Sequence, residues 1–392
     1  LLVAAILITF GLLVIRAPRL DGLEHHEPFI VEEVEDPQAV QHGLDVKCAE
    51  AKGILADVLA SRNNAQEITC VFILNGEARL INLIESQGSP YGWYREMASR
   101  FFNDVARHEH SGSLAGVGII VTEDDATLPP SVVSKLAEIQ VPLLPHSIHK
   151  RSRNYSIPIP DWHFIEQRGW EDLIKVLSSK GKPFSARKEI IYWRGSTTGA
   201  IPASFSASVL NNMAHCPRCA LIQRVSAVKH ARSHPWLDIN ITKAVQGCGG
   251  CVEYLQRGFA MEGSDNDQQI HNEVDWINAR GILDIDGNVN AWGSRWRFET
   301  GSVVFKVDSP YLNAYLDRAR PHVHFVPIFE NLTNLVSVTK AIVGPENAEK
   351  FERIANNSRL LMSEFTYDKE VERVSKELKA VWKTTPRNRT AI

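Results

Sequence analysis

Apolar positions along the chain follow two different spacings. Runs of β-branched and apolar residues predict strands at residues 68–74, 80–84, 116–121, 189–193 and 303–307. Apolar residues three or four positions apart predict helices at residues 45–60, 91–108, 132–139 and 165–180. The pair Asn75–Gly76 between the first two strands is typical of a hairpin turn. Strands and helices keep alternating further along, which indicates an α/β protein with parallel sheets.

Two helices are predicted near the C-terminal end. Pro345 is placed well for the first residue of the first helix. Its buried side is marked by Phe351, Ile354, Ala355, Leu361, Met362 and Phe365. The second helix is indicated by Val371, Val374, Leu378, Val381 and Trp382. These residues define a C-terminal helical segment, 346–384.

The N-terminal residues 1–15 are continuously apolar and end at Arg16. A helix needs roughly 20 apolar residues to cross a bilayer. Because no initiator Met precedes the run, we expect a truncated signal anchor or a signal peptide, with a buried core helix as the alternative. No small-residue cleavage motif follows, which favours the anchor. Residues 16–44 are polar and acidic with three prolines, and this composition predicts a stem.

Composition narrows the range of partners and compartments. The 392 residues carry a net charge of −3, so no electrostatic argument favours nucleic acid. Triplets of the form N-x-S/T, which favour the secretory pathway, begin at Asn154, Asn240, Asn331, Asn356 and Asn388. The C-terminus is not a KDEL-type signal, which favours the Golgi over the endoplasmic reticulum. The predicted location is the lumen of one of these, as a single-pass type II membrane protein.

Six cysteines are present, and four of them form the pairs CPRC and CGGC at Cys216, Cys219, Cys248 and Cys251. This spacing matches a structural zinc ribbon. In an oxidising lumen the same four residues can instead form disulfides. Neither pair lies in a thioredoxin-like βαβ context, so a redox role is less well supported. In either form the quartet is predicted to be structural.

The segment from Asp284 to Tyr311 has the chemistry of a phosphate-and-sugar site. It contains Asp284 and Asp286, Gly287, two arginines and a β-branched run. Carboxylates accept hydrogen bonds from sugar hydroxyls, while Arg and Lys bind phosphate oxygens. A common structural alternative is an Asp-Gly turn between two strands. The spacing Asp-Ile-Asp also has the form of a DxD motif, whose carboxylate oxygens can hold Mn²⁺.

Polar residues follow several of the predicted strands. Asp125 comes after the strand at 116–121, residues 194–198 follow another strand, and Asp286 follows a third. In open α/β sheets, ligands bind beyond the carboxyl ends of the strands. We therefore expect these three strand ends to meet at one crevice.

Four sequence blocks resemble the protein O-glucosyltransferase family, glycosyltransferase family 90, which includes lipopolysaccharide-modifying enzymes and capsule xylosyltransferases. The blocks are PDWHF at 160–164, IIYWRGSTT at 190–198, the segment 284–311 and PHVHFVPI at 321–328. They occur in the family's order and cover about residues 115 to 365. The resemblance implies a GT-B fold, with two Rossmann-like domains facing a central cleft. By this interpretation residues 45–185 form the acceptor-side domain and residues 186–345 form the nucleotide-sugar domain.

The resemblance also implies roles for individual residues. The general base corresponds to Asp125, although the family's Asp-aromatic-Pro pattern is Asp125-Ala126-Thr127 here. The family's arginine corresponds to Gly293, so Arg295, two positions along a presumed strand, becomes the expected diphosphate contact. The remaining expected donor-site residues are Arg194, Gly195, Ser196, Thr197, Asp286, Gly287 and Ser302. Family members of this type need no metal cofactor, which argues against the Mn²⁺ alternative.

The leading hypothesis is an inverting glycosyltransferase that moves glucose or xylose from a UDP-sugar to a hydroxyl of a protein or glycan. The first alternative is a catalytically inactive, membrane-anchored relative that binds sugar or protein. The second is a zinc-ribbon interaction protein. The near-neutral net charge argues against a zinc-ribbon protein that binds nucleic acid.

Overall fold

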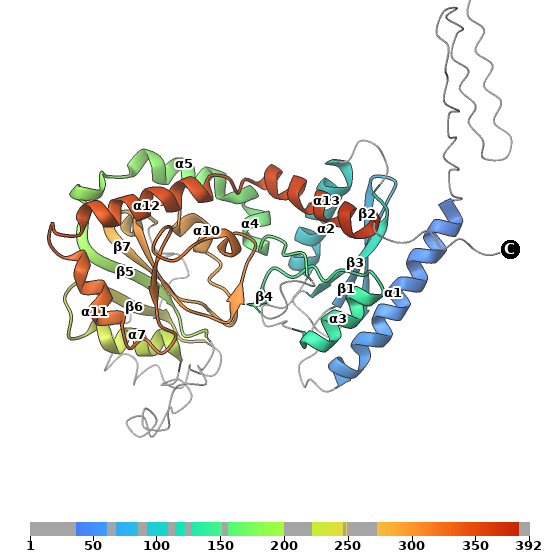
Figure 1. Cartoon of the computed structure of the whole chain (residues 1–392), viewed down its shortest axis with the longest axis horizontal. Helices are drawn as coiled ribbons and strands as arrows, with labels where there is room; N and C mark the ends of the chain where they lie inside the picture. Colours follow the sequence, from blue (N-terminus) through green and yellow to red (C-terminus); the bar gives the residue numbers. More distant parts are fainter. Residues whose placement is uncertain are drawn as a thin grey trace, which may run out of the picture.

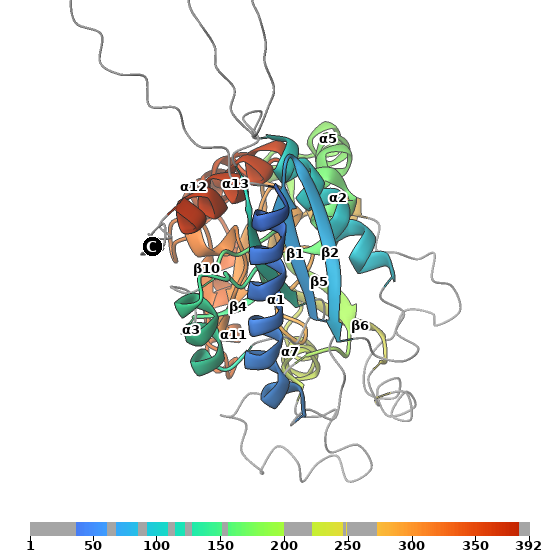
Figure 2. The ribbon, with the colours of Figure 1, turned by 90° about the vertical axis from the view of Figure 1, so that its right-hand side faces the viewer.

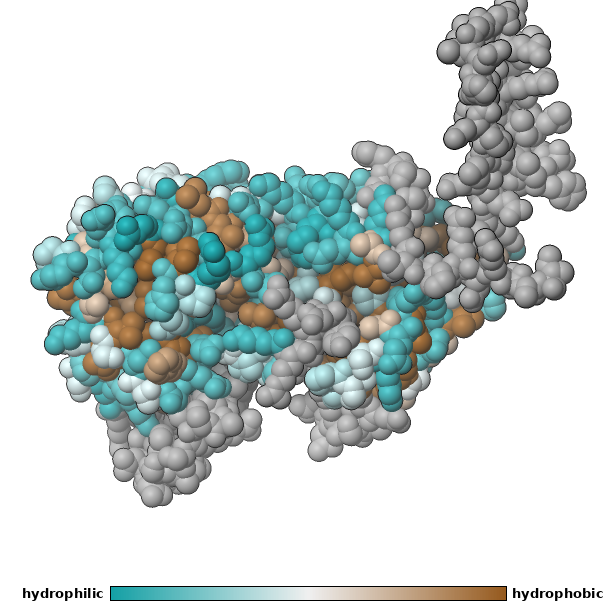
Figure 3. All heavy atoms as spheres, in the orientation of Figure 1, coloured by the Kyte–Doolittle hydropathy of each residue, from teal (hydrophilic) through white to brown (hydrophobic). Residues whose placement is uncertain are grey.

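The computed structural model describes residues 37–60, 68–84, 92–108, 114–121, 128–150, 156–199, 222–245, 248 and 273–383. They form two lobes, each built on its own sheet (Figure 1). A three-stranded sheet lies in the N-terminal lobe and a five-stranded sheet lies in the C-terminal lobe. The visible surface is mostly hydrophilic, with apolar patches over the C-terminal lobe (Figure 3).

The N-terminal lobe contains an antiparallel sheet in the order β2-β1-β3. Its elements are α1 (Pro37–Ala60), β1 (Ile68–Leu74), β2 (Glu77–Ile84), α2 (Gly92–His108), β3 (Gly116–Val121) and α3 (Pro130–Glu138). Asn75 and Gly76 have φ angles of 54° and 77°, as a tight hairpin turn requires, so the predicted hairpin is confirmed. Leu143 adds single parallel bridges to Ile119 and Ser156.

The predicted Rossmann-like N-terminal domain is therefore not what the described residues show. A Rossmann-type domain needs a crossover helix between neighbouring parallel strands. Here the two-residue turn at Asn75–Gly76 makes β1 and β2 antiparallel, and β3 also pairs antiparallel with β1. Successive side chains of β1 point to opposite faces. Cys70 and Phe72 face α1 and α3, whereas Val71 and Ile73 face α2.

Helix α1 covers one face of this sheet and changes two expectations. Figure 2 shows it on the outer surface of the lobe. It begins at Pro37 and already buries Leu44, so residues 37–44 of the predicted stem are part of the folded lobe. Residues 1–36, with the predicted anchor, lie outside the described part. None of the described helices combines the length and the apolar character that a membrane crossing needs.

Two cysteines for which the sequence suggested no partner are joined in this lobe. Cys48 of α1 and Cys70 of β1 form a disulfide. They are 22 positions apart. Closing a loop of this length stabilises a fold by roughly 3 kcal/mol, mainly through the unfolded chain. The bond fixes α1 to the central strand of the sheet.

The C-terminal lobe contains a parallel sheet in the order β10-β8-β7-β5-β6. Its strands are β5 (Lys188–Ser196), β6 (Leu237–Lys243), β7 (Ala279–Asp284), β8 (Val303–Val307) and β10 (Val326–Ile328). Its helices are α5 (Glu171–Lys180), α7 (Gln223–Ala231), α9 (Glu273–Asn278), α10 (Ser294–Arg297), α11 (Leu335–Thr339) and α12 (Ala348–Met362). In Figure 1, α5 and α12 cover one face and α7 and α11 the other. This parallel α/β lobe is the part of the predicted fold that is confirmed.

The strand order locates the region where a ligand is expected. Numbered along the chain within this sheet, the five strands run 2-1-3-4-5 in space. The order reverses between β5 and β7. In doubly wound sheets of this order the ligand crevice opens at that switch point, outside the carboxyl ends of the two strands.

Contacts between described residues of the two lobes include a strand pair and a helix. Strands β4 (Ile148–His149) and β9 (Tyr311–Leu312) form an antiparallel pair between them. Helix α13 (Tyr367–Lys383) leaves the C-terminal lobe and packs on α2, where Trp382 donates a hydrogen bond from Nε1 to the Val117 carbonyl at 3.2 Å. The first C-terminal helix begins at Ala348 rather than at Pro345, which lies in the preceding turn.

Candidate functional site

The loops after β5 and β7 lie against each other at the switch point of the sheet. A Cβ atom on Gly287 would be 3.4 Å from Thr198 Oγ1 and 3.3 Å from an Arg224 nitrogen. Gly199 has a φ of 151°, and a Cβ there would be 3.9 Å from the Asp286 carbonyl. Glycine at these positions therefore allows the two loops to approach closely.

Arg224, in the first turn of α7, connects the two loops. Its Nε donates to the Asp286 carbonyl at 2.9 Å, and its Nη2 donates to the Ile285 carbonyl at 3.2 Å. Its Nη1 donates to the Ser196 carbonyl at 3.3 Å and to Thr198 Oγ1. Only one of these hydrogen bonds goes to a side chain, the neutral Thr198 hydroxyl, so they leave the positive charge without a direct counter-ion.

The charge of Arg224 persists at neutral pH. Burial is the largest influence on this group, and together with the charge of Arg297 it lowers the pKa to about 10. Asp286 and Asp284 act in the opposite direction. A guanidinium with that pKa is still protonated at pH 7, so the switch point holds a buried cation.

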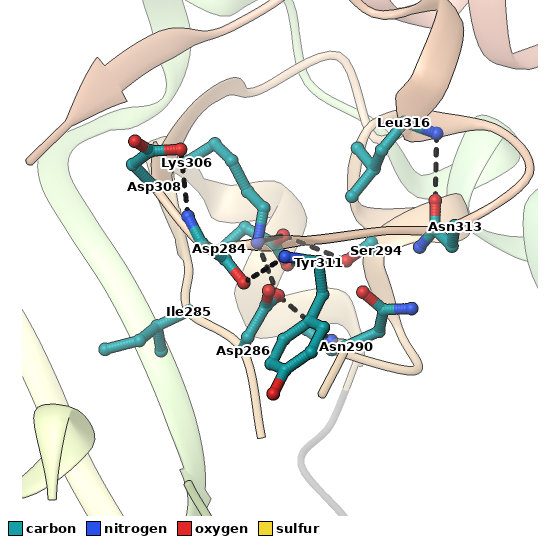
Figure 4. A network of polar contacts seen from close by, with 12 residues as sticks. Asp284, Ile285, Asp286, Asn290, Ser294, Lys306, Asp308, Tyr311, Asn313 and Leu316 are labelled. Atoms are coloured by element: carbon teal, nitrogen blue, oxygen red, sulfur yellow. Dashed lines mark hydrogen bonds and ion pairs between the residues drawn. The ribbon is translucent and has the colours of Figure 1, made fainter. Parts of the chain in front are cut away.

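Next to Arg224, two carboxylates share one lysine (Figure 4). Lys306 Nζ is 2.5 Å from Asp286 Oδ1 and 3.2 Å from Asp284 Oδ2. Arg297 Nη1 is 3.1 Å from Asp284 Oδ1, and the Ser294 hydroxyl donates to both oxygens of Asp284. Both carboxylates thus point to the same side of β8 because β7 ends at Asp284 and the chain turns there.

The pKa shifts in this cluster follow from the pairing. Burial alone would raise the pKa of the Asp284 carboxyl, but Lys306 and Arg297 outweigh it and lower that pKa below its usual range. Burial likewise disfavours the charged amine of Lys306, and the two carboxylates outweigh it and raise its pKa. With Arg224, the cluster has three cations and two anions, which leaves an excess of one positive charge.

A cavity of about 450 Å³ adjoins this cluster at the ends of β8 and β10. Lys306, Tyr311, Phe325 and Phe329 are among the residues that line it. Its size is within the range of small-molecule sites. Phe329 at this cavity is 59% exposed.

The structure places several predicted donor-site residues in contacts within the protein. Arg194 forms an ion pair with Asp238 at 2.8 Å and lies 4.4 Å from the centre of the Tyr192 ring. Gly195 packs on Trp193, whose ring would be 2.5 Å from a Cβ there. These contacts direct Arg194 toward β6 rather than toward the crevice.

Three further predicted residues are also engaged internally. Thr197 exchanges hydrogen bonds with the backbone of Val245. Ser302 accepts from Arg187 Nη1 at 2.7 Å and donates to the Ala279 carbonyl at 2.8 Å. Of the predicted 194–198 turn, Ser196 and Thr198 are the residues that contact Arg224.

Arg295 departs most clearly from the expectation. It lies in the short helix α10 and not in a strand, so the argument from strand alternation does not apply. Its Nε and Nη2 donate to the Phe365 carbonyl at 3.1 and 3.0 Å, and its Nη1 pairs with Glu299. Arg295 therefore holds the chain after α12, while Arg297 points to Asp284.

The remaining residues to place are Asp125, Asp161 of the PDWHF block and the cysteine quartet. Asp125 lies outside the described residues. Asp161 caps α4 (Trp162–Glu166) by accepting from the Phe164 amide at 2.9 Å, and it also accepts from the Tyr315 hydroxyl at 2.5 Å. Of the cysteine quartet only Cys248 is described, and it is buried and disulfide-bonded, which favours the disulfide interpretation over zinc.

Comparison with known proteins connects this site to a family. Residues 223–375 match the family model of glycosyl transferase family 90. Protein O-glucosyltransferase 3 of Rattus norvegicus is 35% identical over 78 residues, which are 20% of this chain and 15% of that protein. The chain thus aligns with a small part of that relative. The family resemblance seen in the sequence is confirmed, and the matched segment includes Arg224, both carboxylates and Lys306.

Proposed function

We propose that the chain, whose residues 223–375 match glycosyl transferase family 90, is an inverting glycosyltransferase. It moves glucose or xylose from a UDP-sugar to a hydroxyl of a protein or glycan acceptor. The observation that carries this proposal is the buried cation Arg224 at the switch point, which gives the neighbouring cluster of Lys306, Arg297, Asp284 and Asp286 one excess positive charge. A screen for transfer or hydrolysis with UDP-glucose, UDP-xylose and UDP-galactose tests it. Turnover of none of them by the folded protein would favour the inactive relative.

In this proposal the switch point binds the diphosphate of the donor. Negative charge grows on the leaving diphosphate as its bond to the anomeric carbon breaks. Fixed cations stabilise that charge without having to reorganise. The acceptor hydroxyl loses its proton to a carboxylate base, predicted to be Asp125, and its oxygen bonds to the anomeric carbon from the opposite side. UDP leaves, and the configuration of the sugar is inverted.

We predict that UDP binding does not depend on a divalent cation. In many sugar-nucleotide sites a metal held by carboxylates neutralises the diphosphate. Here Asp284 and Asp286 are paired with Lys306, and Arg224 supplies a further charge. Calorimetric titration with UDP should give the same affinity, within about twofold, with and without EDTA. Loss of binding on chelation would contradict the prediction and favour a metal at the two carboxylates.

We predict that Arg224→Gln weakens UDP binding by about 10- to 100-fold, because a hydrogen bond to a charged group contributes about 1.5–3 kcal/mol. Arg224→Lys should recover part of the loss, since it restores the charge without the planar fork. Arg353→Gln, on the exposed side of α12, is the matched control and should bind UDP as the wild type does. Circular dichroism verifies folding, and wild-type affinity of a folded Arg224→Gln variant would contradict the assignment.

We further propose that the protein works in the lumen of the Golgi or endoplasmic reticulum, held by an N-terminal anchor. The Cys48–Cys70 disulfide supports an oxidising compartment. Asn331, in one of the N-x-S/T triplets, is exposed and can be reached by a glycosylating enzyme. The alternative, an inactive relative that binds sugar or protein, is favoured by the cavity with the exposed Phe329.

A further inference from the structure

Four buried polar atoms at the junction of the lobes have no hydrogen-bond partner among the described residues. They are Ser147 Oγ, Asp286 Oδ2, Asn290 Oδ1 and Asn313 Nδ2. All four residues are at most 6% exposed. Buried polar groups in folded proteins are nearly always paired, and an unpaired group costs free energy. Four such atoms in one region indicate that something outside the polypeptide pairs them.

The fold brings these residues together from both lobes. In the antiparallel pair β4–β9, Ile148 faces Leu312, so the next position along each strand places Ser147 beside Asn313. Asn290 donates from Nδ2 to the His146 carbonyl at 3.4 Å. Figure 4 shows the Asn290 side chain between Asp286 and Asn313. The four atoms therefore lie between the charged cluster and the N-terminal lobe.

The orientation of both amides is fixed by their other atoms. Because Asn290 Nδ2 is used on a carbonyl, its Oδ1 is the free atom and can only accept. Asn313 Oδ1 accepts from the Leu316 amide at 2.8 Å, so its free Nδ2 can only donate. Asp286 Oδ1 is used by Lys306 and by the Ala291 amide, and its free Oδ2 accepts. Ser147 can donate or accept.

This set of atoms fits hydroxyl groups and not phosphate. Two acceptors, one of them on a carboxylate, would repel phosphate oxygens, whereas a sugar hydroxyl both donates and accepts. Asp286 is shared, since its Oδ1 belongs to the charged cluster and its Oδ2 to the junction. The junction thus lies directly beside the expected diphosphate, on the side of the N-terminal lobe.

We propose that Ser147, Asp286, Asn290 and Asn313 bind the hydroxyls of the sugar that is transferred. This rests on the proposed function, because it takes the diphosphate to lie at Arg224 and Lys306. Ser147 comes from the N-terminal lobe and the other three from the C-terminal lobe. The sugar therefore completes a hydrogen-bonded contact between the lobes. No sequence block of the family resemblance contains Ser147, and the other three were not connected to it.

The test compares UDP with UDP-sugars on two conservative variants. Ser147→Ala removes a hydroxyl that makes no hydrogen bond to a described residue. Asn313→Ser keeps a neutral acceptor for the Leu316 amide and removes the Nδ2 donor without adding a charge. The UDP-sugar to use is UDP-glucose or UDP-xylose, whichever the wild type binds more tightly than UDP. Each variant should weaken its binding by about 10- to 100-fold. Affinity for UDP alone should change by less than about twofold. Asn331→Ser, on the surface, is the matched control.

The other outcomes separate this inference from the proposed function. Equal losses for UDP and the UDP-sugar would place the ribose or the diphosphate at the junction and overturn the inference. Unchanged affinities for both would show that water alone pairs these atoms, and would overturn it too. A wild-type protein that binds both UDP-sugars no more tightly than UDP would do the same. Absence of any UDP binding would instead refute the proposed function itself.

Discussion

Replacing Lys306 by methionine is expected to lower the free energy of unfolding by about 3–5 kcal/mol, because it leaves two buried carboxylates without their shared cation. Asp284 is fully buried and Asp286 nearly so. Lys150→Met is the matched control. It removes an ion pair to Asp308 of 2.8 Å, but both partners are exposed, so the loss should stay below about 1 kcal/mol. Urea unfolding followed by circular dichroism measures both variants.

The deficit of Lys306→Met should also depend on pH in a defined direction. In the wild type the pKa of Asp284 is lowered, so its ionised form contributes stability above the unfolded pKa, and this is lost as pH falls through the folded pKa. In the variant, burial is no longer outweighed by Lys306, so the pKa of Asp284 should rise. Protonation then relieves the penalty. The difference between variant and wild type should therefore shrink as pH falls, first through the raised pKa of Asp284 in the variant and then through its lowered pKa in the wild type.

A pH-independent deficit would mean that the lost packing of the lysine stem, and not the unpaired charge, causes the destabilisation. A deficit equal to that of Lys150→Met would show that the buried cluster is as weakly coupled as a surface pair. Either result would contradict the electrostatic description of the switch point.

Individual strands were the part of the fold best predicted from sequence. The runs at 68–74 and 116–121 are β1 and β3 of the N-terminal sheet, and the run at 303–307 is β8 of the parallel sheet, all with the predicted bounds. These strands are almost entirely buried, so their apolar, β-branched composition identifies them. Composition does not show which strands pair or in which direction, because that depends on the segments that connect them. The Asn75–Gly76 turn already indicated an antiparallel pair in the N-terminal lobe, and local chemistry prevailed there over the two-Rossmann expectation.

Residue roles were harder to predict because they depend on where a short segment turns. The stretch from Asn290 to Trp296 has no clear period, and Arg295 was treated as a strand residue. In the structure four residues form α10, and this directs Arg295 to the Phe365 carbonyl and Arg297 to Asp284. A shift of two residues keeps the face of a strand but rotates a helix by more than half a turn.

Arg224 was not selected from the sequence, although one signal was present. A cation in the first turn of a helix opposes the helix dipole, which favours negative charge at that end. Such a residue is expected only where other contacts outweigh that cost. Arg224 makes four hydrogen bonds to the end of β5 and to the loops after β5 and β7, with partners 26 to 62 positions away in the chain. Because these partners are distant in sequence, the hydrogen bonds that outweigh the unfavourable helix dipole become visible only in the fold.

The largest expected effect on catalysis comes from Asp125→Asn. This variant should lower the turnover number by about 10²–10⁴, because an amide cannot take the proton of the acceptor hydroxyl. UDP affinity should stay within a few-fold of wild type, since in the proposed function the base acts on the acceptor and the diphosphate binds at Arg224. Single-turnover transfer assays and calorimetry with UDP measure the two quantities separately.

Two other carboxylates, Asp161 and Asp124, serve as comparisons for Asp125. Asp161 is excluded as the base by its contacts, because one oxygen accepts from the Phe164 amide and the other from the Tyr315 hydroxyl. Burial also raises the pKa of Asp161, despite both hydrogen bonds, which makes it a poor candidate for a base that must be ionised. Asp124→Asn is the matched control and should retain transfer. If Asp124→Asn loses turnover while Asp125→Asn keeps it, the base moves by one residue. If both variants keep turnover, the general base that takes the proton of the acceptor hydroxyl must be a residue outside the segment that follows β3.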